Sequence, residues 1–420
     1  MSPTTIPGNF VLQSPAANDP LLDLNTQPSL DLQFATSKTL NDRVSGLPLV
    51  DHQRDVSSGK SAGTYVDSTG VIRTSKVNLF TYSELIDTTG SWTENLITAT
   101  PNQPGPFGVS TASLVVNTNN GNLGKNVSSA IGTYTLSFYA RSGASPWLMV
   151  GLTVDGVFTR VWWNLTTQTV GSSDALTHSI VPVDATWSRC TVVIPVVTSP
   201  FTSINWYATD NDNTNARTNT SNSFYIWGAQ LEEGSTASPY IPTTNLPSAA
   251  PRFDHDPTTN ASLGLLVEES RTNLLSYSED FTQWTSNNTG GTNPIVTPNT
   301  IIAPDGTLTA DSIFYTSSSA ALNAIYATPP SPGLTQGVSY TFSVYLKVAS
   351  GTATIPIGIT DDNNIGNDIA INCNLTTSWQ RFSVTFTKGT GTLSAGVIGW
   401  YTNWREQGTG PHQRFSEQFY

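Results

Sequence analysis

The sequence is poor in charge, cysteine and histidine. Of 420 residues, 18 are Lys or Arg and 30 are Asp or Glu, so 11% of the chain is charged, whereas soluble domains average roughly 25%. This low density excludes a coiled coil, a charged helical bundle and a charge-rich disordered tail. The formal net charge is −12, and phosphate binding requires clustered Lys and Arg. We therefore expect no nucleic-acid partner.

Signals for export, membranes and cofactors are equally scarce. The first residues, 1–7, hold no basic group and no apolar core, so they are not expected to form a secretory signal. No apolar run approaches the roughly 18 residues of a membrane span, and no membrane insertion is expected. Cys190 and Cys373 are far apart and are expected to be buried free thiols, with one long-range disulfide as the alternative. No phosphate loop, zinc spacing or nucleophile elbow is present, so the sequence assigns no catalytic residue and no cofactor and predicts a protein that is not an enzyme.

What the chain does contain is alternation of polar and apolar residues. Residues 133–140 and 339–346 have a period of two, which suits a pleated surface buried on one side. The breaks between such runs are rich in Gly, Asn, Asp and Pro, as in Asn120-Gly121 and Asp155-Gly156, and favour turns. Many short strands separated by turns are typical of a sandwich or barrel. The sequence therefore predicts an all-β protein.

The chain also repeats itself. Four pairs of matching segments keep the same order: 78–84 with 273–279, 134–139 with 340–345, 186–189 with 378–381, and 204–207 with 398–401. A period this long indicates tandem domains rather than a solenoid, and we expect two jelly-roll β-sandwich modules. The expected organisation is an extended N-terminal arm (1–30), a β-hairpin docking region (31–77), a first jelly-roll module (78–244), a hairpin linker (245–272), a second jelly-roll module (273–405) and a C-terminal tail (406–420).

Four segments carry a family resemblance: 32–40, the hairpin 65–72, 252–257 with 264–274, and 227–234. Together they resemble virion structural proteins of tailed bacteriophages. Residues 227–234, followed by 239–243, resemble the closing strand of carbohydrate-binding-module-like jelly rolls in phage fibres and decoration proteins. The resemblance implies a place in the virion, partners among the tail or capsid proteins, assembly into homo-oligomers and contact with host surface glycans.

The sequence departs from this family pattern in two ways. In such proteins the hairpin at 65–72 is often followed directly by the segment that begins at Arg252, whereas here a whole module lies between them. The second module ends in the segment 404–412, without a copy of the closing strand 227–234. We therefore expect that module to be incomplete or to be completed by another chain, because a missing strand leaves a sheet edge open.

Six aromatic residues are candidates for glycan or interface contact: Trp162, Trp163, Trp206, Tyr207, Trp400 and Tyr401. Adjacent strand residues face opposite sides, so one of Trp162 and Trp163 is expected to face away from the module core, toward solvent, a neighbouring chain or a ligand. The repeat-matched Trp187 and Trp379 are expected to be packing anchors, with exposed sugar-stacking platforms as the alternative.

No metal is assigned, but two acidic segments can be compared with calcium loops. Asp210 and Asp212 begin a segment that lacks the Gly and Glu of such a loop, and Asp361 and Asp362 form the other weak candidate. A solvated turn is the default interpretation, with structural calcium as the minority hypothesis. In the segment 254–256 strand alternation separates His255 from its two Asp neighbours, which favours a structural hairpin over a catalytic site.

The function that the sequence favours is that of a non-enzymatic structural component of a tailed-phage virion, either a tail fibre or a tail-associated adaptor. Weak glycan contacts in many copies would give it avidity. A capsid decoration or head-fibre protein is the alternative within this class. From another class, a glycan-degrading enzyme or its carbohydrate-binding module remains open, because fold resemblance alone does not fix function.

Overall fold

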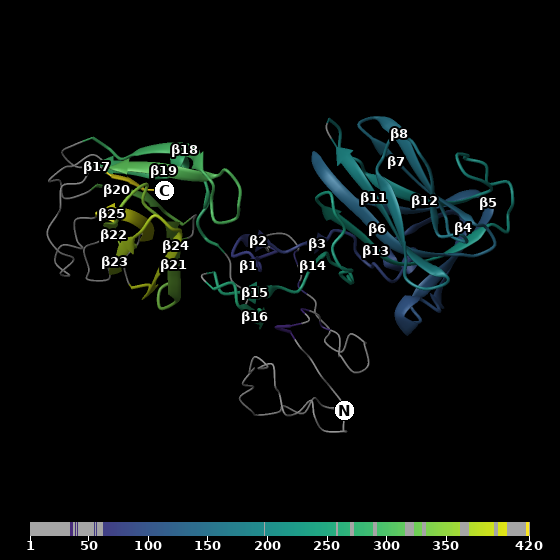
Figure 1. Cartoon of the computed structure of the whole chain (residues 1–420), viewed down its shortest axis with the longest axis horizontal. Helices are drawn as coiled ribbons and strands as arrows, with labels where there is room; N and C mark the ends of the chain where they lie inside the picture. The colour runs from purple at the N-terminus through teal and green to yellow at the C-terminus, as the bar shows by residue number, and fades with distance from the viewer. Residues whose placement is uncertain are drawn as a thin grey trace, which may run out of the picture. The chain divides into compact units, whose positions relative to one another are not determined.

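The computed structural model describes residues 34–36, 38, 40, 54, 56, 62–196, 198–257, 259–268, 273–288, 292–315, 323–329, 333–361, 369–389, 394–400 and 417–419. The expected N-terminal arm (1–30), Tyr401 and Asp362 lie outside these residues. The chain divides into two compact units, Met1–Val267 and Glu268–Tyr420. Strands dominate both units (Figure 1). None of the described helices has the length and apolar character needed to cross a membrane.

The first unit contains a long antiparallel sheet. Its strands are β4 (Thr93–Gln103), β5 (Ala112–Asn126), β6 (Gly132–Ser142), β7 (Trp147–Val154), β8 (Val157–Asn164), β9 (Thr169–Ser173), β10 (His178–Pro182), β11 (Trp187–Val196), β12 (Ser203–Thr209) and β13 (Ser223–Glu233), with the short 3₁₀ turns η2 (Thr88–Gly90) and η3 (Pro106–Gly108). The strand order is β10-β11-β6-β13-β5-β12-β7-β8-β9, and β4 pairs with β5.

Strand β5 folds this sheet into two layers. Its first half pairs with β13, as Val115 with Phe224, and its second half pairs with β12, as Leu123 with Trp206. The change of partner falls at Gly121, where a Cβ atom would lie 2.2 Å from two backbone carbonyl oxygens of β4. Only glycine fits this close approach of two paired strands, which falls at the register shift between Asn95 and Ile97. The segment Asn120-Gly121, expected to be a turn between strands, therefore lies inside one continuous strand.

Aromatic side chains fill the space between the layers. Trp163 and Trp206 are fully buried, and Phe138 meets them edge to face at ring-centroid distances of 5.5 and 5.8 Å. Such contacts contribute beyond the burial of area. Cys190 is buried in the same core as a free thiol, as expected. The all-β jelly-roll prediction is confirmed.

The second unit repeats this plan. Its strands are β17 (Thr285–Asn288), β18 (Ile295–Ile301), β19 (Ala310–Tyr315), β20 (Asn323–Ala327), β21 (Ser339–Leu346), β22 (Ala353–Asp361), β23 (Ile369–Leu375), β24 (Gln380–Thr387), β25 (Ser394–Trp400) and β26 (Glu417–Phe419), with the 3₁₀ turn η4 (Phe281–Gln283). One layer has the order β17-β20-β25-β22-β23, which corresponds to β4-β5-β12-β7-β8. Pairing of β21 with β24 reproduces that of β6 with β11, because Phe342 faces Val384 as Leu136 faces Val192.

A strand of the same chain lies beside β19. Residue Phe419 of β26 pairs with Ile313 of β19, just as Phe224 of β13 pairs with Val115 of β5. The stretch expected to be a C-terminal tail (406–420) thus supplies a strand at the edge where another chain was one of the alternatives. Among the described strands, β21 pairs with β24 alone, whereas β6 also pairs with β13.

Two hairpins of the first unit form a small structure that we call the clasp: β1 (Thr64–Val66) with β2 (Ile72–Thr74), and β15 (Phe253–His255) with β16 (Ser262–Leu265). The Val66 amide donates to Asp254 Oδ1 (2.7 Å), and the His255 ring nitrogen Nδ1 lies 2.9 Å from the Val66 carbonyl oxygen. The expected structural hairpin around His255 is therefore present.

Short strands close the first module at its two ends. Strand β3 (Val77–Asn78) pairs with β14 (Ser248–Ala249), so Val77 lies opposite Ala249. The first module is therefore an insertion between β3 and β14, the two short strands that pair at its base. This explains the departure noted in the sequence, because the two hairpins of the clasp meet in space although a whole module separates them in the chain.

Candidate functional site

One surface of the first module combines aromatic rings, amides and a guanidinium. Along β12 and β7, Trp206 and Val150 point into the core, so Asn205, Tyr207 and Gly151 lie on the opposite side of the layer. We call this side of strands β5, β12, β7 and β8 the outer face. It is defined by Asn120, Asn122, Gly151, Phe158, Asn205 and Tyr207.

A ladder of asparagine amides joins β4 to two strands of the outer face, β5 and β12. Asn95 Nδ2 of β4 donates to Asn122 Oδ1 of β5 (3.0 Å), and Asn122 Nδ2 donates to Asn205 Oδ1 of β12 (2.9 Å). The residue beside the ladder is Gly124, where a Cβ atom would lie 3.0 Å from Asn205 Oδ1. Carboxamides present both donors and acceptors, so the ladder can bind hydroxyl groups in either sense.

Two aromatic rings meet above Gly151. A Cβ atom on this glycine would lie 2.7 Å from Phe158 Cζ and 3.3 Å from Tyr207 Cε2, so the missing side chain leaves room for both rings. Tyr207 is half-buried, but Phe158 is 47% exposed. Phe158 is one of several large apolar side chains that are exposed in the described residues, and it shares the outer face with Tyr207 and the polar groups beside it.

A guanidinium lies over the Tyr207 ring. Arg217 lies 4.6 Å from the Tyr207 ring centroid, and its Nε donates to Asn120 Oδ1 (2.8 Å). Burial lowers the pKa of Arg217 and raises the pKa of Tyr207, while the two groups favour each other's charged forms. The guanidinium is therefore fixed in position by a cation–π contact and a hydrogen bond.

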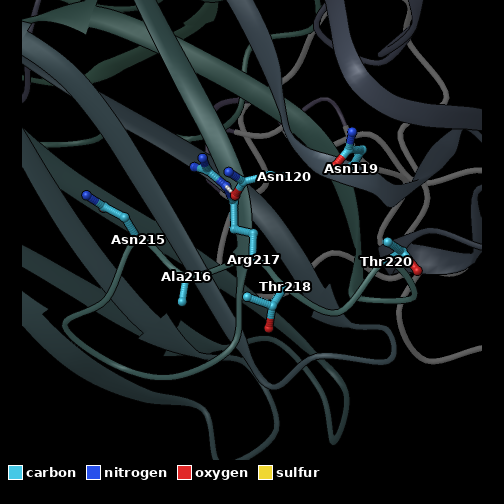
Figure 2. A pocket seen from close by; sticks show the side chains of 7 residues that line it. All are labelled: Asn119, Asn120, Asn215, Ala216, Arg217, Thr218 and Thr220. Carbon is cyan, nitrogen blue, oxygen red and sulfur yellow. Dashed lines mark hydrogen bonds between the residues drawn. The ribbon is translucent and has the colours of Figure 1, made fainter.

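Arg217 borders an open hollow of about 400 Å³, lined by Asn119, Asn120, Asn215, Ala216, Arg217, Thr218 and Thr220. Figure 2 shows Arg217 and Asn120 in contact, with Asn215 and Thr218 on the same loop. The lining carries amides, hydroxyls and one guanidinium, and no carboxylate. Its chemistry suits hydrogen bonding to a polar, oxygen-rich ligand.

Asp210 and Asp212 hold the loop that delivers Arg217. Asp210 accepts from the backbone amide and hydroxyl of Thr218 (3.0 and 2.8 Å), and Asp212 accepts from the amide and hydroxyl of Ser172 (2.9 and 3.0 Å). Burial opposes ionisation of Asp210, but these hydrogen bonds outweigh it and lower its pKa. The two weak calcium candidates act as loop anchors here. No group of three or more His, Cys, Asp or Glu residues suited to a metal occurs in the described part of the chain. Asp361 ends β22.

Three of the six aromatic candidates are not exposed platforms. Trp163 and Trp206 belong to the core and are fully buried. Trp162 does face away from the core, as strand alternation predicts, but it is also fully buried. Its Nε1 donates to the Thr214 carbonyl oxygen (3.1 Å), and Arg160 lies 5.0 Å from its ring. The expectation that it faces solvent, a ligand or another chain is wrong, because the chain's own loop covers it.

The remaining candidates have different outcomes. Tyr207 lies on the outer face, as described above. Trp400 ends β25, and Tyr401 lies outside the described residues. Trp187 is buried, as an anchor should be, whereas Trp379 is half-buried and donates from Nε1 to the Ile302 carbonyl oxygen (3.0 Å).

Sequence reasoning missed Phe158, Arg217 and the asparagine ladder. A signal for Phe158 was available, because it follows the turn Asp155-Gly156 and its parity along the strand is opposite to that of Val161 and Trp163. Arg217 gave no signal, since it lies in a loop whose path depends on side-chain hydrogen bonds.

One family model matches part of the second unit. Residues 310–404 match the family model described as a carbohydrate binding domain. This segment runs from β19 to β25 and then beyond it. No curated protein matches the chain.

Solved structures with some likeness include two tandem carbohydrate-binding modules. The CBM22-1-CBM22-2 tandem of Paenibacillus barcinonensis Xyn10C is 11% identical, with 87% of this chain and 97% of that chain covered and a TM-score of 0.31. The tandem CBM51 modules of Sp3GH98, a family 98 glycoside hydrolase from Streptococcus pneumoniae, are 11% identical, with coverage of 88% and 97% and a TM-score of 0.22. The enzymatically active domain of the Bacteriophage CBA120 tailspike protein 4 is 13% identical over 36% of this chain and 21% of that chain, with a TM-score of 0.24.

Proposed function

We propose that this protein binds glycans without cleaving them, through the outer face of its first module and through the second module. The observation that carries the proposal is the exposed Phe158 ring beside the amide ladder and Arg217. A sugar ring has an apolar C–H face and a rim of hydroxyls, so it is matched by an aromatic ring next to planar amide and guanidinium groups. The family match of residues 310–404 supports the same activity for the second module.

The carboxylates near the outer face support binding rather than hydrolysis. Glycoside hydrolysis uses two carboxyl groups that face each other across the substrate. Asp174 is paired with Arg160 (2.6 Å), Asp210 accepts from Thr218 of its own loop, and Asp212 accepts from Ser172 of β9. Release of reducing ends from a bound polysaccharide by the purified protein would contradict the non-enzymatic part of the proposal.

We also propose that the protein is a structural component of a tailed-phage virion, as a tail fibre or tail-associated adaptor, with a capsid decoration or head-fibre position as the alternative. Support comes from the four sequence segments that resemble such proteins. In this setting other virion proteins and further copies of the chain are its partners, and many weak glycan sites gain avidity from display on one particle. Gold-labelled antibody on purified virions, viewed by electron microscopy, tests the location and separates tail from capsid.

The glycan-binding proposal is tested by replacing the exposed ring. Phe158→Ala should weaken binding to immobilised polysaccharides about 3–10-fold, the effect of losing one aromatic contact, and should leave the melting temperature unchanged because the ring is half in solvent. Affinity electrophoresis in gels containing single polysaccharides gives the measurement.

The matched control is Val157→Ala, because Val157 is also exposed (65%), lies next to Phe158 and has the opposite strand parity. Equal loss of affinity in both variants, or no retardation of the wild type by any polysaccharide, would refute the role of the outer face.

A further inference from the structure

Arg217 differs from two arginines of the first unit that form ion pairs. Arg73 lies 2.8 Å from Asp67, and Arg160 lies 2.6 Å from Asp174. The contacts of Arg217 are instead an amide oxygen and an aromatic ring, and Tyr207 is the titratable group that acts on it. Within the described residues, Arg217 therefore has no acidic side chain at ion-pair distance. Arg141 and Arg189 likewise lie over aromatic rings, but neither of them lines the hollow that Arg217 borders.

The surroundings of Arg217 leave space for an anion. The hollow beside it is lined by neutral donors and acceptors from asparagine and threonine side chains. A partly desolvated cation is costly unless an anion compensates it. Guanidinium binds carboxylate and sulfate-like oxyanions through two parallel hydrogen bonds. An oxyanion in the hollow would supply the partner that the protein itself does not provide.

We infer that the outer face selects acidic polysaccharides, with Arg217 binding a carboxylate or sulfate group of the sugar while Phe158 stacks on a sugar ring. This inference rests on the proposed glycan-binding function and specifies its ligand class. Phe158 and Tyr207 both approach Gly151, and Arg217 lies over the Tyr207 ring, so one chain of sugars can reach both Phe158 and Arg217. The anionic group is recognised by a single fixed guanidinium, and the uncharged hydroxyls are left to the asparagine ladder.

Because the protein has a negative net charge, binding of an acidic polysaccharide requires a local site on its surface. A chain with a formal net charge of −12 repels polyanions at long range. This repulsion is screened beyond about 8 Å at physiological ionic strength, whereas a hydrogen-bonded contact at Arg217 is not. Retention of an acidic polysaccharide by this protein therefore reports a local site rather than general charge attraction.

The test compares acidic with neutral polysaccharides on the full chain. Isothermal titration and affinity electrophoresis would use alginate as the carboxylate probe, carrageenan as the sulfate probe, and laminarin and xylan as neutral probes. Arg217→Gln removes the charge, and Arg217→Lys keeps it without the planar fork. The control Arg73→Gln makes the same charge change in the clasp, and circular dichroism with thermal melting checks that each variant is folded.

We expect Arg217→Gln to weaken binding of at least one acidic probe about 10–100-fold, as for the loss of a charged hydrogen bond, with Arg217→Lys in between and Arg73→Gln close to wild type. The acidic probe that loses affinity identifies carboxylate or sulfate. Unchanged acidic binding in Arg217→Gln overturns the inference. Binding of neutral probes alone overturns it and leaves the glycan-binding function standing, whereas binding of no probe overturns both. If both Arg217 variants unfold, Asn120→Ala, which frees the guanidinium from its anchor, must weaken acidic binding or the inference falls.

Discussion

A single buried lysine occupies an apolar position of the first module. Lys125 is 3% exposed, and its Nζ donates to the Gly90 and Ser91 carbonyl oxygens (3.1 and 3.4 Å) while it lies 5.1 Å from the Trp92 ring centroid. The repeat places fully buried Ile325 at the same position of the second module. The ammonium thus holds the η2 turn by hydrogen bonds, where its counterpart relies on packing.

This lysine should make stability depend on pH. Burial lowers the pKa of Lys125 from 10.5 to about 8. Between these values the unfolded chain keeps a proton that the folded chain has released, so the free energy of unfolding rises with pH. Relative to Lys125→Met, we expect the wild type to gain about 1–2 kcal/mol between about pH 7.5 and about pH 9.5, measured by urea unfolding of the first module.

The wild type is compared with Lys125→Met because the buried thiol of Cys190 changes the pH dependence of stability in the opposite direction. Burial raises the pKa of Cys190 well above its usual value, so the unfolded chain loses that proton first and stability falls as pH rises. Both proteins share this effect. A difference between wild type and Lys125→Met that stays constant with pH would contradict the account of Lys125.

At the residue scale, the sequence predicts which side of a strand a side chain lies on better than it predicts whether that side chain is exposed to solvent. Strand alternation correctly places Trp162 and Trp163 on opposite sides of β8. It does not reveal that a loop anchored by Asp212 covers Trp162, because a loop path depends on hydrogen bonds between residues distant in the chain. Tyr207 was found for its aromatic character, whereas its partner Arg217 became visible only through the fold.

At the element scale, the decisive feature is the change of partner within β5. Polar–apolar alternation and turn residues were enough to predict strands, and the matching segments were enough to predict the repeat. The close approach of β4 to β5 at Gly121 could not be predicted, because Asn120-Gly121 has the composition of a hairpin turn. Here the same two residues lie inside a continuous strand, at a register shift where β4 runs so close beside β5 that only glycine fits.

Replacing Gly121 tests the close approach of β4 to β5. In Gly121→Ala the new Cβ would lie 2.2 Å from the Asn95 and Leu96 carbonyl oxygens, so the backbone must shift. We expect a loss of about 2–4 kcal/mol and a melting temperature of the first module lowered by roughly 5–15 °C.

Gly156→Ala is the matched control for Gly121→Ala. Gly156 has φ of +81°, and a Cβ atom added there would meet no other atom within 4 Å, so alanine costs only conformational strain, about 1 kcal/mol. Calorimetry of both variants gives the comparison. Equal melting temperatures of the two variants would show that β4 and β5 can move apart at Gly121 without an additional loss of stability.

At the scale of the whole molecule, the clasp explains how an inserted module is tolerated. Both hairpins were predicted from the sequence, but their pairing with each other was not, because no local signal reports a contact between residues 66 and 254. The pairing of β3 with β14 was missed for the same reason. These contacts come from the tertiary fold, and the short strands are marginal on their own.

A disulfide across the base of the first module tests this closure. Val77 and Ala249 lie directly opposite each other in an antiparallel pair, a spacing that a disulfide can bridge. Val77→Cys with Ala249→Cys should oxidise readily, and the long closed loop should stabilise the module by about 3–5 kcal/mol. Mass spectrometry and calorimetry, with the reduced protein as control, give the readout. Failure of the bond to form would argue against the paired ends.

The paired base of the first module has a mechanical consequence. When the chain is pulled from both ends, tension passes through the hydrogen bonds between β3 and β14 and through the clasp before it reaches the inserted sandwich. The inserted sandwich then bears little of the tension, because it lies outside the path along which the force is transmitted. Such an inserted domain can be replaced by another without altering how force is transmitted along the rest of the chain.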